Sequence, residues 1–466
     1  MGKWTDRVYK SSPLWLQTLG INAFGYFWAR RRLGPVFEST WREYAAREAW
    51  SPEQMSEYVE RQLREQVKRA YGEVPYYREA FRKHGVTESL IANFSACDLT
   101  KLPLLSKASV RQNPAALLIS RAAKNPPKVF STSGTTGLPI RVFWDKETHQ
   151  RNMAAREARS LRWAGVSYRK SRAVVGGRLI VPKAESEPPF WRYNHWEKQL
   201  YLSAFHINPS TVADYVSALN RFRPELITGY SSANYFLANE IMRSKLKVYS
   251  PRAIITNSDR LEPYMRPVLE SVYQCSVREE YGSVENCVLA TECEKGGLHV
   301  HPDFGYAEIL NSDGQPAPKG DVGELVVTGF TNTQQLFIRY RIGDLAAWAT
   351  EPCSCGRDAL PTLKEVIGRL EDAVVLRDGR RLMRLDHAFR ELKGISEGQI
   401  IQKDYDRFVV KVVPTLLFSQ TDVELIKTRL ATRLGTELTI EVQSVDSIPR
   451  EPNGKFRMVI SQIAKN

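Results

Sequence analysis

Apolar and charged residues alternate at helical spacing between Ser51 and His84. The stretch opens with Ser51-Pro-Glu-Gln, in which the serine can cap a helix and the glutamine three positions later can bond back to it. After Asp145 the helical spacing returns and continues through Trp163, with many arginines that we expect on the solvent-facing side. The pattern therefore predicts helices over 51–84 and 146–163.

An apolar run from Leu14 to Ala29 precedes these helices and ends in the basic triplet Arg30–Arg32. Gln17 and Asn22 interrupt the run, which also lacks the small-residue cleavage site of a signal peptide and is too short to span a bilayer comfortably. We expect a helix packed on the body of the protein. The alternative is a helix lying on an anionic membrane surface, which the basic flank would favour.

Short β-rich runs alternate with helical ones in the middle of the chain. The β-rich runs cover 173–175, 226–229 and 253–256, and the helical ones cover 212–222 and 233–243. This alternation predicts an α/β sheet with loops at the strand ends, where open sheets bind their ligands. The loops Gly229–Ser232 and Thr256–Asp259 are therefore candidate ligand loops, although either can be an ordinary strand-to-helix cap.

The pattern changes again toward the C-terminus. The segment 305–330 is predicted to form β-hairpins with a turn at Asp313-Gly314. Composition shifts at Gly368–Asp372, and strands over 399–402 and 408–413 and a helix over 422–434 follow. We predict an α/β fold with a large multi-layer N-terminal domain over 1–367, which begins with a helical extension over about 1–100, and a smaller α+β domain over 373–466.

Composition and charge narrow the functional classes. With 42% hydrophobic and 25% charged residues, the 466-residue chain can form two or three cores and is neither disordered nor a membrane protein. Its net charge of +14 suits anionic ligands or an anionic surface. The sequence contains no zinc-finger spacing, no aromatic-basic RNA-binding signature and no single basic block. We therefore expect a solvated basic surface and no nucleic-acid partner.

The cysteines suggest a metal site and not a disulfide framework. Six cysteines are too few and too unevenly spaced for such a framework, which predicts a reducing, cytoplasmic location. Cys293, Cys353 and Cys355 with His299 offer the ligands of a closed structural zinc site, although free cysteines are also common as buried small apolar residues. His301 lies on the same strand face as His299, so the choice between the two histidines stays open.

A hydroxyl-rich loop is the most informative stretch of the sequence. Ser131-Thr-Ser-Gly-Thr-Thr-Gly-Leu-Pro139 combines five hydroxyls with two glycines, so its backbone N–H groups and side chains can surround a phosphate. No lysine follows Gly137, which excludes the usual P-loop. Strand-like runs at 127–130 and 140–144 flank the loop, which makes a flexible linker the weaker interpretation.

Two further motifs carry groups suited to a nucleotide. In Glu280-Tyr-Gly-Ser-Val-Glu285, Tyr281 can stack on a base and Glu285 can bind Mg²⁺. In Arg339-Tyr-Arg-Ile-Gly-Asp344, the carboxylate of Asp344 can accept hydrogen bonds from ribose hydroxyls. The alternative for Asp344 is a surface salt bridge. A third candidate is Lys455, presented by the proline- and glycine-containing loop Ile448–Arg457, where a solvated lysine is the usual finding.

Taken in order, these motifs resemble those of the adenylate-forming superfamily of acyl-CoA synthetases, peptide-synthetase adenylation domains and luciferases. The resemblance rests on Ser131–Pro139, Tyr281–Glu285, Tyr340–Asp344, Gly368–Asp372 and Gly454-Lys455. Val74-Pro-Tyr-Tyr77 and the Cys/His set further resemble the phenylacetate–CoA ligase group, in particular its branch of coenzyme F390 synthetase and CapK-like proteins. That branch carries such a Cys/His cluster, which favours the structural zinc.

The resemblance implies a cytoplasmic, AMP-forming ligase that uses ATP and Mg²⁺. It activates a small carboxylic acid to an acyl-adenylate and then transfers the acyl group to an acceptor. Lys455, Glu285 and Thr135 would be catalytic, and the segment 368–372 would be a hinge, with Glu371, that moves the C-terminal domain as a lid. The implied nucleotide-binding residues are Ser131, Thr132, Ser133, Gly134, Thr135, Thr136, Gly137, Ser258, Asp259, Tyr281, Gly282, Ser283, Asp344 and Arg369.

Two departures from the family pattern bear on the acceptor. Val284 stands where a threonine is usual, and Leu376–Leu382 differs from the loop that CoA ligases use to form their thiolation site. We place CoA ahead of an amine or hydroxyl acceptor on a cell-surface precursor, for which a membrane-bound basic helix over 14–32 would be suited.

We expect the acid pocket to be lined by Trp144, Phe205, Tyr230 and Tyr235. Such a lining favours an aromatic or other apolar acid, unless these rings belong to the core. A non-catalytic basic scaffold with the same fold is the alternative of another class. The retention of Lys455, Glu285 and Asp344 argues against it.

Overall fold

The computed structural model describes residues 8–119, 127–131, 140–178, 180–182, 185, 187–369, 373–377, 381–382, 385–389, 392–435, 438–451 and 453–463. The chain forms two compact units. The first comprises Met1–Ile342 and Ala346–Val366, and the second comprises Gly343–Leu345 and Ile367–Asn466.

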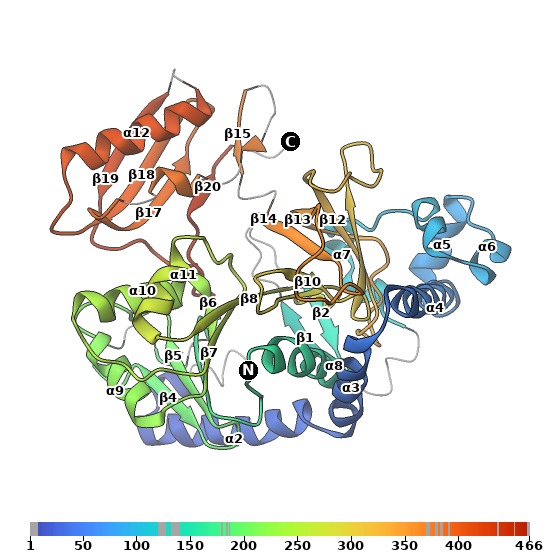
Figure 1. Ribbon diagram of the computed structural model, residues 1–466, viewed down its shortest axis with the longest axis horizontal. Coiled ribbons are helices and arrows are strands. Elements are labelled where there is room, and N and C mark those ends of the chain that lie inside the picture. The colour runs from blue at the N-terminus through green and yellow to red at the C-terminus, as the bar shows by residue number, and fades with distance from the viewer. Residues whose placement is uncertain are drawn as a thin grey trace. The chain divides into compact units, whose positions relative to one another are not determined.

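The first unit begins with helices, as the spacing of apolar residues predicts. They are α2 (Leu14–Arg32), α3 (Pro35–Ala46), α4 (Pro52–Glu73), α5 (Pro75–Lys83), α6 (Glu88–Ala92) and α7 (Lys107–Gln112) (Figure 1). Ser51 and Gln54 form the reciprocal cap of α4. Val74, which precedes a proline, is extended and separates α4 from α5.

Helix α2 packs on the body of the protein, as expected. Its buried side includes Gln17, Ile21, Gly25 and Trp28, and it contacts β4 (Trp191–Asn194) and α8 (Lys146–Arg156). A side chain at Gly25 would collide with that of Asn194, so the close approach of helix and strand requires glycine there. Within the described residues, no helix is long and apolar enough to cross a membrane.

One large mixed sheet forms the centre of the first unit. Its strand order is β11-β12-β13-β14-β10-β9-β8-β7-β6-β3-β5-β4. Strands β3, β5, β6, β7 and β8 pair in parallel, whereas the pairs β4–β5, β8–β9, β9–β10, β10–β14 and β11–β12 are antiparallel. The bounds are β3 (Arg172–Gly176), β5 (Gln199–Ser203), β6 (Leu226–Tyr230), β7 (Ala253–Asn257), β8 (Ser276–Gly282), β9 (Leu289–Glu292), β10 (Leu298–Val300), β11 (Gly305–Leu310), β12 (Gly323–Gly329), β13 (Tyr340–Trp348) and β14 (Thr362–Arg369).

Helices α9 (Val212–Phe222), α10 (Ser231–Arg243) and α11 (Met265–Tyr273) alternate with the parallel strands and bury one face of them. Strands β11 and β12 form the predicted hairpin. The α/β prediction is therefore confirmed for this unit.

The second unit has a small sheet of its own. Its strand order is β19-β18-β17-β20, formed by β17 (Ile395–Gln402), β18 (Arg407–Pro414), β19 (Thr439–Ser444) and β20 (Val459–Ser461). Helix α12 (Gln420–Leu434) covers this sheet, and a short pair, β15 (Val374–Val375) and β16 (Arg381–Leu382), precedes it. Both predicted strands and the predicted helix are confirmed, each somewhat longer than expected.

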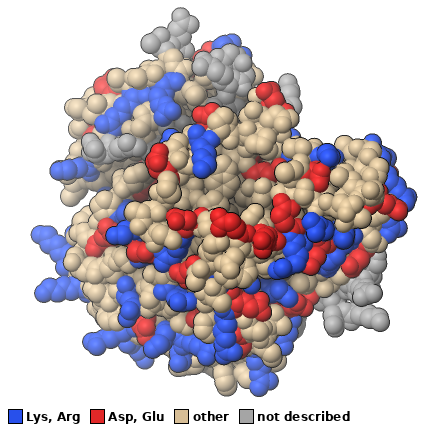
Figure 2. Space-filling model, turned by 45° about the vertical axis from the view of Figure 1, so that its right-hand side comes forward, with Lys and Arg blue, Asp and Glu red and all other residues tan. Residues whose placement is uncertain are grey.

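Lysines and arginines are scattered over the molecular face shown in Figure 2 and do not form one block. One expectation about charge is nevertheless wrong. The arginine at 159 was expected on a solvated helix face, but the helix continues beyond α8 as a π-helical turn (Glu157–Leu161) and Arg159 is fully buried. Asp303, also buried, accepts hydrogen bonds from Arg159 (3.0 Å) and from Arg47 (2.9 Å).

We expect Asp303→Asn to lower the free energy of unfolding of the first unit by about 3–5 kcal/mol, because two buried guanidinium groups would lose their only shared anion. All ten tryptophans lie in the first unit, so tryptophan fluorescence during urea denaturation reports on it. Asp313→Asn, at an exposed hairpin turn, is the control and should change the value by less than about 0.5 kcal/mol. Equal values for the two variants would contradict the importance of Asp303.

Candidate active site

The ends of four neighbouring strands form one edge of the large sheet. Strands β3, β6, β7 and β8 run parallel, so the residues at their carboxyl ends, Gly176, Tyr230, Asn257 and Gly282, are brought to the same edge. Open α/β sheets bind ligands at this edge. The two loops singled out from the sequence, 229–232 and 256–259, both lie there.

A β-hairpin carries the hydroxyl loop. Strands β1 (Lys128–Ser131) and β2 (Arg141–Trp144) are antiparallel, with Ser131 opposite Arg141. Both strand predictions are therefore confirmed, and Ser131 is exposed at the end of β1. The other residues expected to bind phosphate lie outside the described residues, so their role stays a prediction: Thr132, Ser133, Gly134, Thr135, Thr136 and Gly137.

The segment after β8 presents a buried carboxylate. Glu285 is 3% exposed and accepts a hydrogen bond from the hydroxyl of Tyr340 at 3.0 Å. No lysine or arginine of the described residues forms an ion pair with Glu285. Beside it, the hydroxyl of Ser283 is buried and has no hydrogen-bond partner in the described part of the chain. A buried carboxylate that pairs with no described cation, and a buried hydroxyl without a described partner two residues before it in the chain, fit a bound metal ion and a phosphate.

The other residues expected around the nucleotide in this unit have structural partners. Tyr281 and Gly282 end β8, and Tyr281 is half-buried against the hydrophobic core. Asp259 accepts hydrogen bonds from the backbone N–H groups of Ser231 (2.6 Å) and Ser232 (3.2 Å) and thereby caps α10. Ser258, exposed after β7, has a φ of 74°. Their contact with a nucleotide stays a prediction.

The second unit holds the remaining candidates. Asp344 lies 3.8 Å from the Nε of Arg369, so the salt bridge considered for Asp344 is present. Lys455 is half-buried, and its backbone N–H donates to the side chain of Asn453 at 2.9 Å. Glu371, the expected hinge residue, lies outside the described residues. The roles proposed for these residues are not tested by their positions within this unit.

A cavity of about 300 Å³ opens beside the ends of β3, β6 and β7. Of the four residues expected in the acid pocket, only Tyr230 is among its lining residues. Trp144 is buried in the core, Phe205 lies half-buried after β5, and Tyr235 packs edge-on against Tyr264. The polar lining of the cavity includes Arg32, Tyr168, Arg172, Arg178, Tyr201 and Asn257.

These arginines were missed in the sequence, although a signal was present. Arg172 and Arg178 flank the apolar run Ala173–Gly177. In a strand, alternate side chains share a face, so Arg172, Val174 and Gly176 all face the cavity while Ala173 and Val175 face the core. An arginine on the ligand side of a predicted strand would have been a sound pointer to this site.

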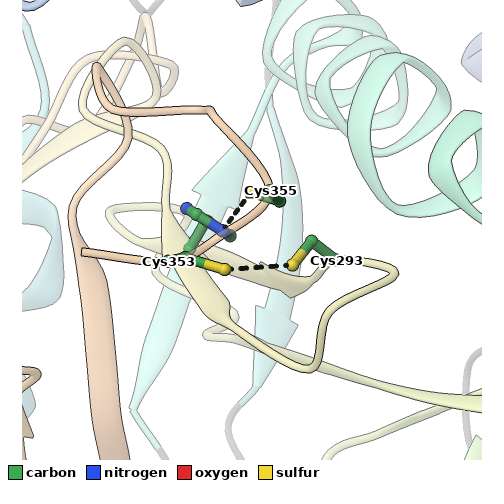
Figure 3. A group of neighbouring side chains, drawn as sticks. Cys293, Cys353 and Cys355 are labelled. Carbon is green, nitrogen blue, oxygen red and sulfur yellow. Dashed lines mark hydrogen bonds between the residues drawn. The ribbon is translucent and has the colours of Figure 1, made fainter. Parts of the chain in front are cut away.

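The three cysteines and His299 come together in the first unit. Their ligand atoms all lie within 4.8 Å of one another. The sulfur atoms of Cys293 and Cys353 are 3.6 Å apart, and Figure 3 shows them pointing toward each other. Two sulfurs bound to one zinc ion are about 3.8 Å apart in a tetrahedral site, so this spacing fits zinc.

The structure also distinguishes the two histidines. The Nε2 of His299 lies 3.2 Å from the sulfur of Cys355, and its Nδ1 lies 2.8 Å from the carbonyl oxygen of Leu360, which suits a neutral ring that donates from Nδ1 and binds a metal through Nε2. The Nε2 of His301 lies instead 2.7 Å from the hydroxyl of Thr291. His299 is therefore the histidine positioned as a ligand.

Local charge supports a thiolate in this cluster. Burial raises the pKa of Cys355, but hydrogen bonds involving Arg357, Cys353 and Cys293 together outweigh it and leave the pKa below its usual value. Burial raises the pKa of Cys293 to about 11. A thiol with a raised pKa is deprotonated only when a metal binds it.

Comparison with known proteins finds similarity to CapK and to phenylacetate–coenzyme A ligases. The CapK C-terminal domain matches residues 377–462. Protein CapK of Staphylococcus aureus is 29% identical over 83% of this chain and 85% of its own length. The phenylacetate–coenzyme A ligase of Thermus thermophilus is 26% identical over 70% of this chain and 72% of its own length.

Solved structures share the fold. A crystal structure of 2-hydroxyisobutyryl-CoA ligase, in the postadenylation state with an acyl-adenylate described as R3-HIB-AMP, has a TM-score of 0.70, at 19% identity and covering 90% of this chain and 92% of that one. The chain is therefore CapK-like, is related to the phenylacetate–CoA ligases and has the fold of an adenylate-forming ligase.

Proposed function

We propose that the enzyme activates a small carboxylic acid with ATP and then transfers the acyl group to CoA. An oxygen of the acid attacks the α-phosphorus of ATP, a new O–P bond forms, and the bond to pyrophosphate breaks. The acceptor then attacks the acyl carbon and AMP leaves. The observation that carries the proposal is the buried carboxylate of Glu285, which follows β8 at the ligand-binding edge of the sheet and pairs with no lysine or arginine of the described residues.

The residue roles follow from charge. Glu285 would hold Mg²⁺, which neutralises phosphate charge, and the hydroxyl loop 131–137 would hold the terminal phosphates. Tyr281 would contact the adenine, and Asp344 with Arg369 the ribose. Lys455 would neutralise the acid and the α-phosphate. We divide the enzyme into a domain over 1–367, a hinge at 368–372 with Glu371, and a mobile lid over 373–466, and we place it in the cytoplasm.

The likeness to two kinds of protein leaves a second candidate acceptor. The phenylacetate–coenzyme A ligases support CoA. The greater identity to CapK supports an amine or hydroxyl in polysaccharide or natural-product biosynthesis. A non-catalytic scaffold is disfavoured, because a scaffold has no need for a buried carboxylate without a counter-charge.

We further propose a structural zinc ion bound by Cys293, His299, Cys353 and Cys355. Four protein ligands leave no open position, so the metal would stabilise the fold and take no part in the reaction. It would join β9, β10 and the segment between β13 and β14.

The outer face of α2 supports peripheral binding to an anionic membrane. Exposed apolar residues, among them Trp15, Leu19 and Phe27, lie along the helix opposite its buried side. Trp196 is exposed beside this helix, against Tyr26. A helix that is apolar on both faces is unusual for a surface position, and the exposed Arg30 and Lys10 near its ends suit anionic lipid headgroups.

Exchange of radioactive pyrophosphate into ATP, measured across a panel of acids, tests the first half-reaction. We expect acid-dependent exchange, and we expect Lys455→Ala to slow it on the order of a thousandfold with little effect on ATP binding, since the lysine acts on transition-state charge. Lys427→Ala, on α12 in the same unit, is the control. Exchange by Lys455→Ala at the wild-type rate would disprove the lysine's role.

The acceptor is tested with the best acid, ATP and CoA, by following AMP release and the acyl product by mass. Thioester formation supports CoA. Accumulated adenylate without thioester would reject CoA and leave the amine- or hydroxyl-transferring reaction.

For zinc, we expect metal analysis of the purified enzyme to find one ion per chain, and Cys353→Ser to lose it together with thermal stability. Cys97→Ser, which changes an exposed cysteine, should keep the metal. Zinc-free wild-type enzyme with all three cluster thiols freely reactive would refute the site.

For the membrane surface, we expect the enzyme to sediment with phosphatidylcholine vesicles that contain phosphatidylserine, and not with phosphatidylcholine alone. Leu19→Asp with Phe27→Asp should abolish this binding. Leu417→Asp is a matched control, because Leu417 is 67% exposed and Phe27 69%. If the wild type does not bind vesicles but forms a dimer that the double variant loses, the outer face of α2 serves self-association instead.

A further inference from the structure

The cavity beside Tyr230 has a basic inner end. The cavity follows β3, where Arg172 begins the strand and Gly176 ends it, a distance of about 13 Å at 3.3 Å per residue. Gly176, Tyr230 and Asn257 mark the end next to the proposed reaction site, where Asn257 pairs with Glu280 of β8. Arg172 and Arg32 line the opposite, inner end.

A smaller pocket of about 70 Å³ continues from this inner end. It shares Arg32, Met153, Tyr168 and Arg172 with the larger cavity and adds Arg169 and Lys198 to the wall. Arg169 pairs with Glu38, so its charge is compensated. Of the charged residues that line this smaller pocket, four are cations and one, Glu197, is an anion.

A single buried carboxylate serves the two inner arginines. Glu197 lies 2.7 Å from Arg32 and 3.6 Å from Arg172, and its side chain is only 2% exposed. Tyr201 and Asn194 also donate to it. Burial lowers the pKa of Arg172, but an arginine stays charged in a protein. Two guanidinium groups and one carboxylate leave one positive charge uncompensated in a desolvated place.

A third guanidinium group stands on the wall. Arg178 donates to the hydroxyl of Tyr201 at 3.1 Å, and within the described residues no carboxylate pairs with it. Arg178 is exposed, so its guanidinium group keeps most of its hydration. The excess of buried positive charge therefore depends on Arg32 and Arg172. Buried cations are normally balanced by an anion, and among the described ion pairs Arg32 and Arg172 have one carboxylate between them.

The size of the space limits what can enter. A cavity of roughly 150 Å³ holds benzene, so about 300 Å³ admits a six- to eight-carbon acid along β3. Met153 and Val174 would contact its middle.

We infer that the acid which this enzyme activates carries a second anionic group, such as a second carboxylate, that binds at the inner end of the cavity near Arg32 and Arg172. This inference rests on the proposed function and names its substrate class. It replaces the apolar acid expected from the sequence with a dicarboxylate, whose near carboxylate reacts at the strand ends and whose far carboxylate supplies the missing negative charge.

Matched pairs of acids test the inference, because the members of each pair differ only in the second carboxylate. Pyrophosphate exchange is measured with adipate against hexanoate and with terephthalate against 4-methylbenzoate. We expect the dicarboxylates to have a kcat/KM at least tenfold higher. Arg32→Gln should reduce this preference at least tenfold through the KM of the dicarboxylate. Lys170→Met, an exposed lysine paired with Glu225, is the control and should keep the preference.

A second variant tests whether a folding defect, and not the lost charge, explains the result with Arg32→Gln. Arg172→Met removes one positive charge and leaves Glu197 paired with Arg32 at 2.7 Å, so it should fold without a stranded carboxylate, and it should lose the dicarboxylate preference as Arg32→Gln does. A preference for monocarboxylates in the wild type, or an unchanged preference in both variants, would overturn the inference and leave the proposed function intact.

Absence of exchange with every acid would instead overturn the proposed function. Calorimetric titration of adipate into the enzyme with ATP would then test separately whether the cavity binds a dicarboxylate. Saturable binding weakened by Arg32→Gln would support the anion site, and absence of binding would reject it.

Discussion

The parallel pairing of β3, β6, β7 and β8 determines where a ligand can bind in this enzyme. It brings the ends of four strands to one edge, so groups from 176 to 285 in the sequence share one region. Tight pairing at that edge depends on Gly229, whose φ is 129° and where a Cβ would lie 1.9 Å from the carbonyl oxygen of Val175. Any larger residue would push β6 away from β3 and open the cavity wall. The position of every ligand-binding group at this edge therefore depends on the register of the sheet.

Three buried carboxylates show how charge is distributed within the first unit. Asp303 holds two arginines and belongs to the folded framework. Glu197 also faces two arginines, but these line a cavity and leave a surplus of positive charge. Glu285 faces no cation of the described residues. Since buried charge is costly unless it is balanced, the surplus and the deficit are best read as places that an anion and a cation of the reaction complete.

Much of this arrangement could be predicted from the sequence, because it depends on local signals. Helical spacing with Ser51 as a cap, alternating β-rich and helical runs, and the hairpin turn at Asp313 each act over a few neighbouring residues. Of the four aromatic residues expected in the acid pocket, Tyr230 alone lines the described cavity, because Trp144 and Tyr235 are equally apolar in a core and in a pocket. The burial of Arg159 depends on Asp303, 144 residues away, and only the tertiary fold brings them together. The residues around Lys455 could be recognised by motif, whereas the place proposed for them in catalysis stays a prediction.

Helix α2 connects the surface with the site through its buried side. Trp28 packs edge-on against His149, with ring centroids 5.0 Å apart, and lies beside Phe130 of the strand that leads into the hydroxyl loop. Burial lowers the pKa of His149 to about 2, so above about pH 3 its ring is neutral and can accept the hydrogen bond from Arg32. Arg32 in turn pairs with Glu197 at the inner end of the cavity. Trp15, Leu19 and Phe27 point to the other side of the same helix. Because the two faces have separate contacts, a charge placed on the outer face should act on membrane binding alone, whereas a change at Arg32 should act on the choice of acid.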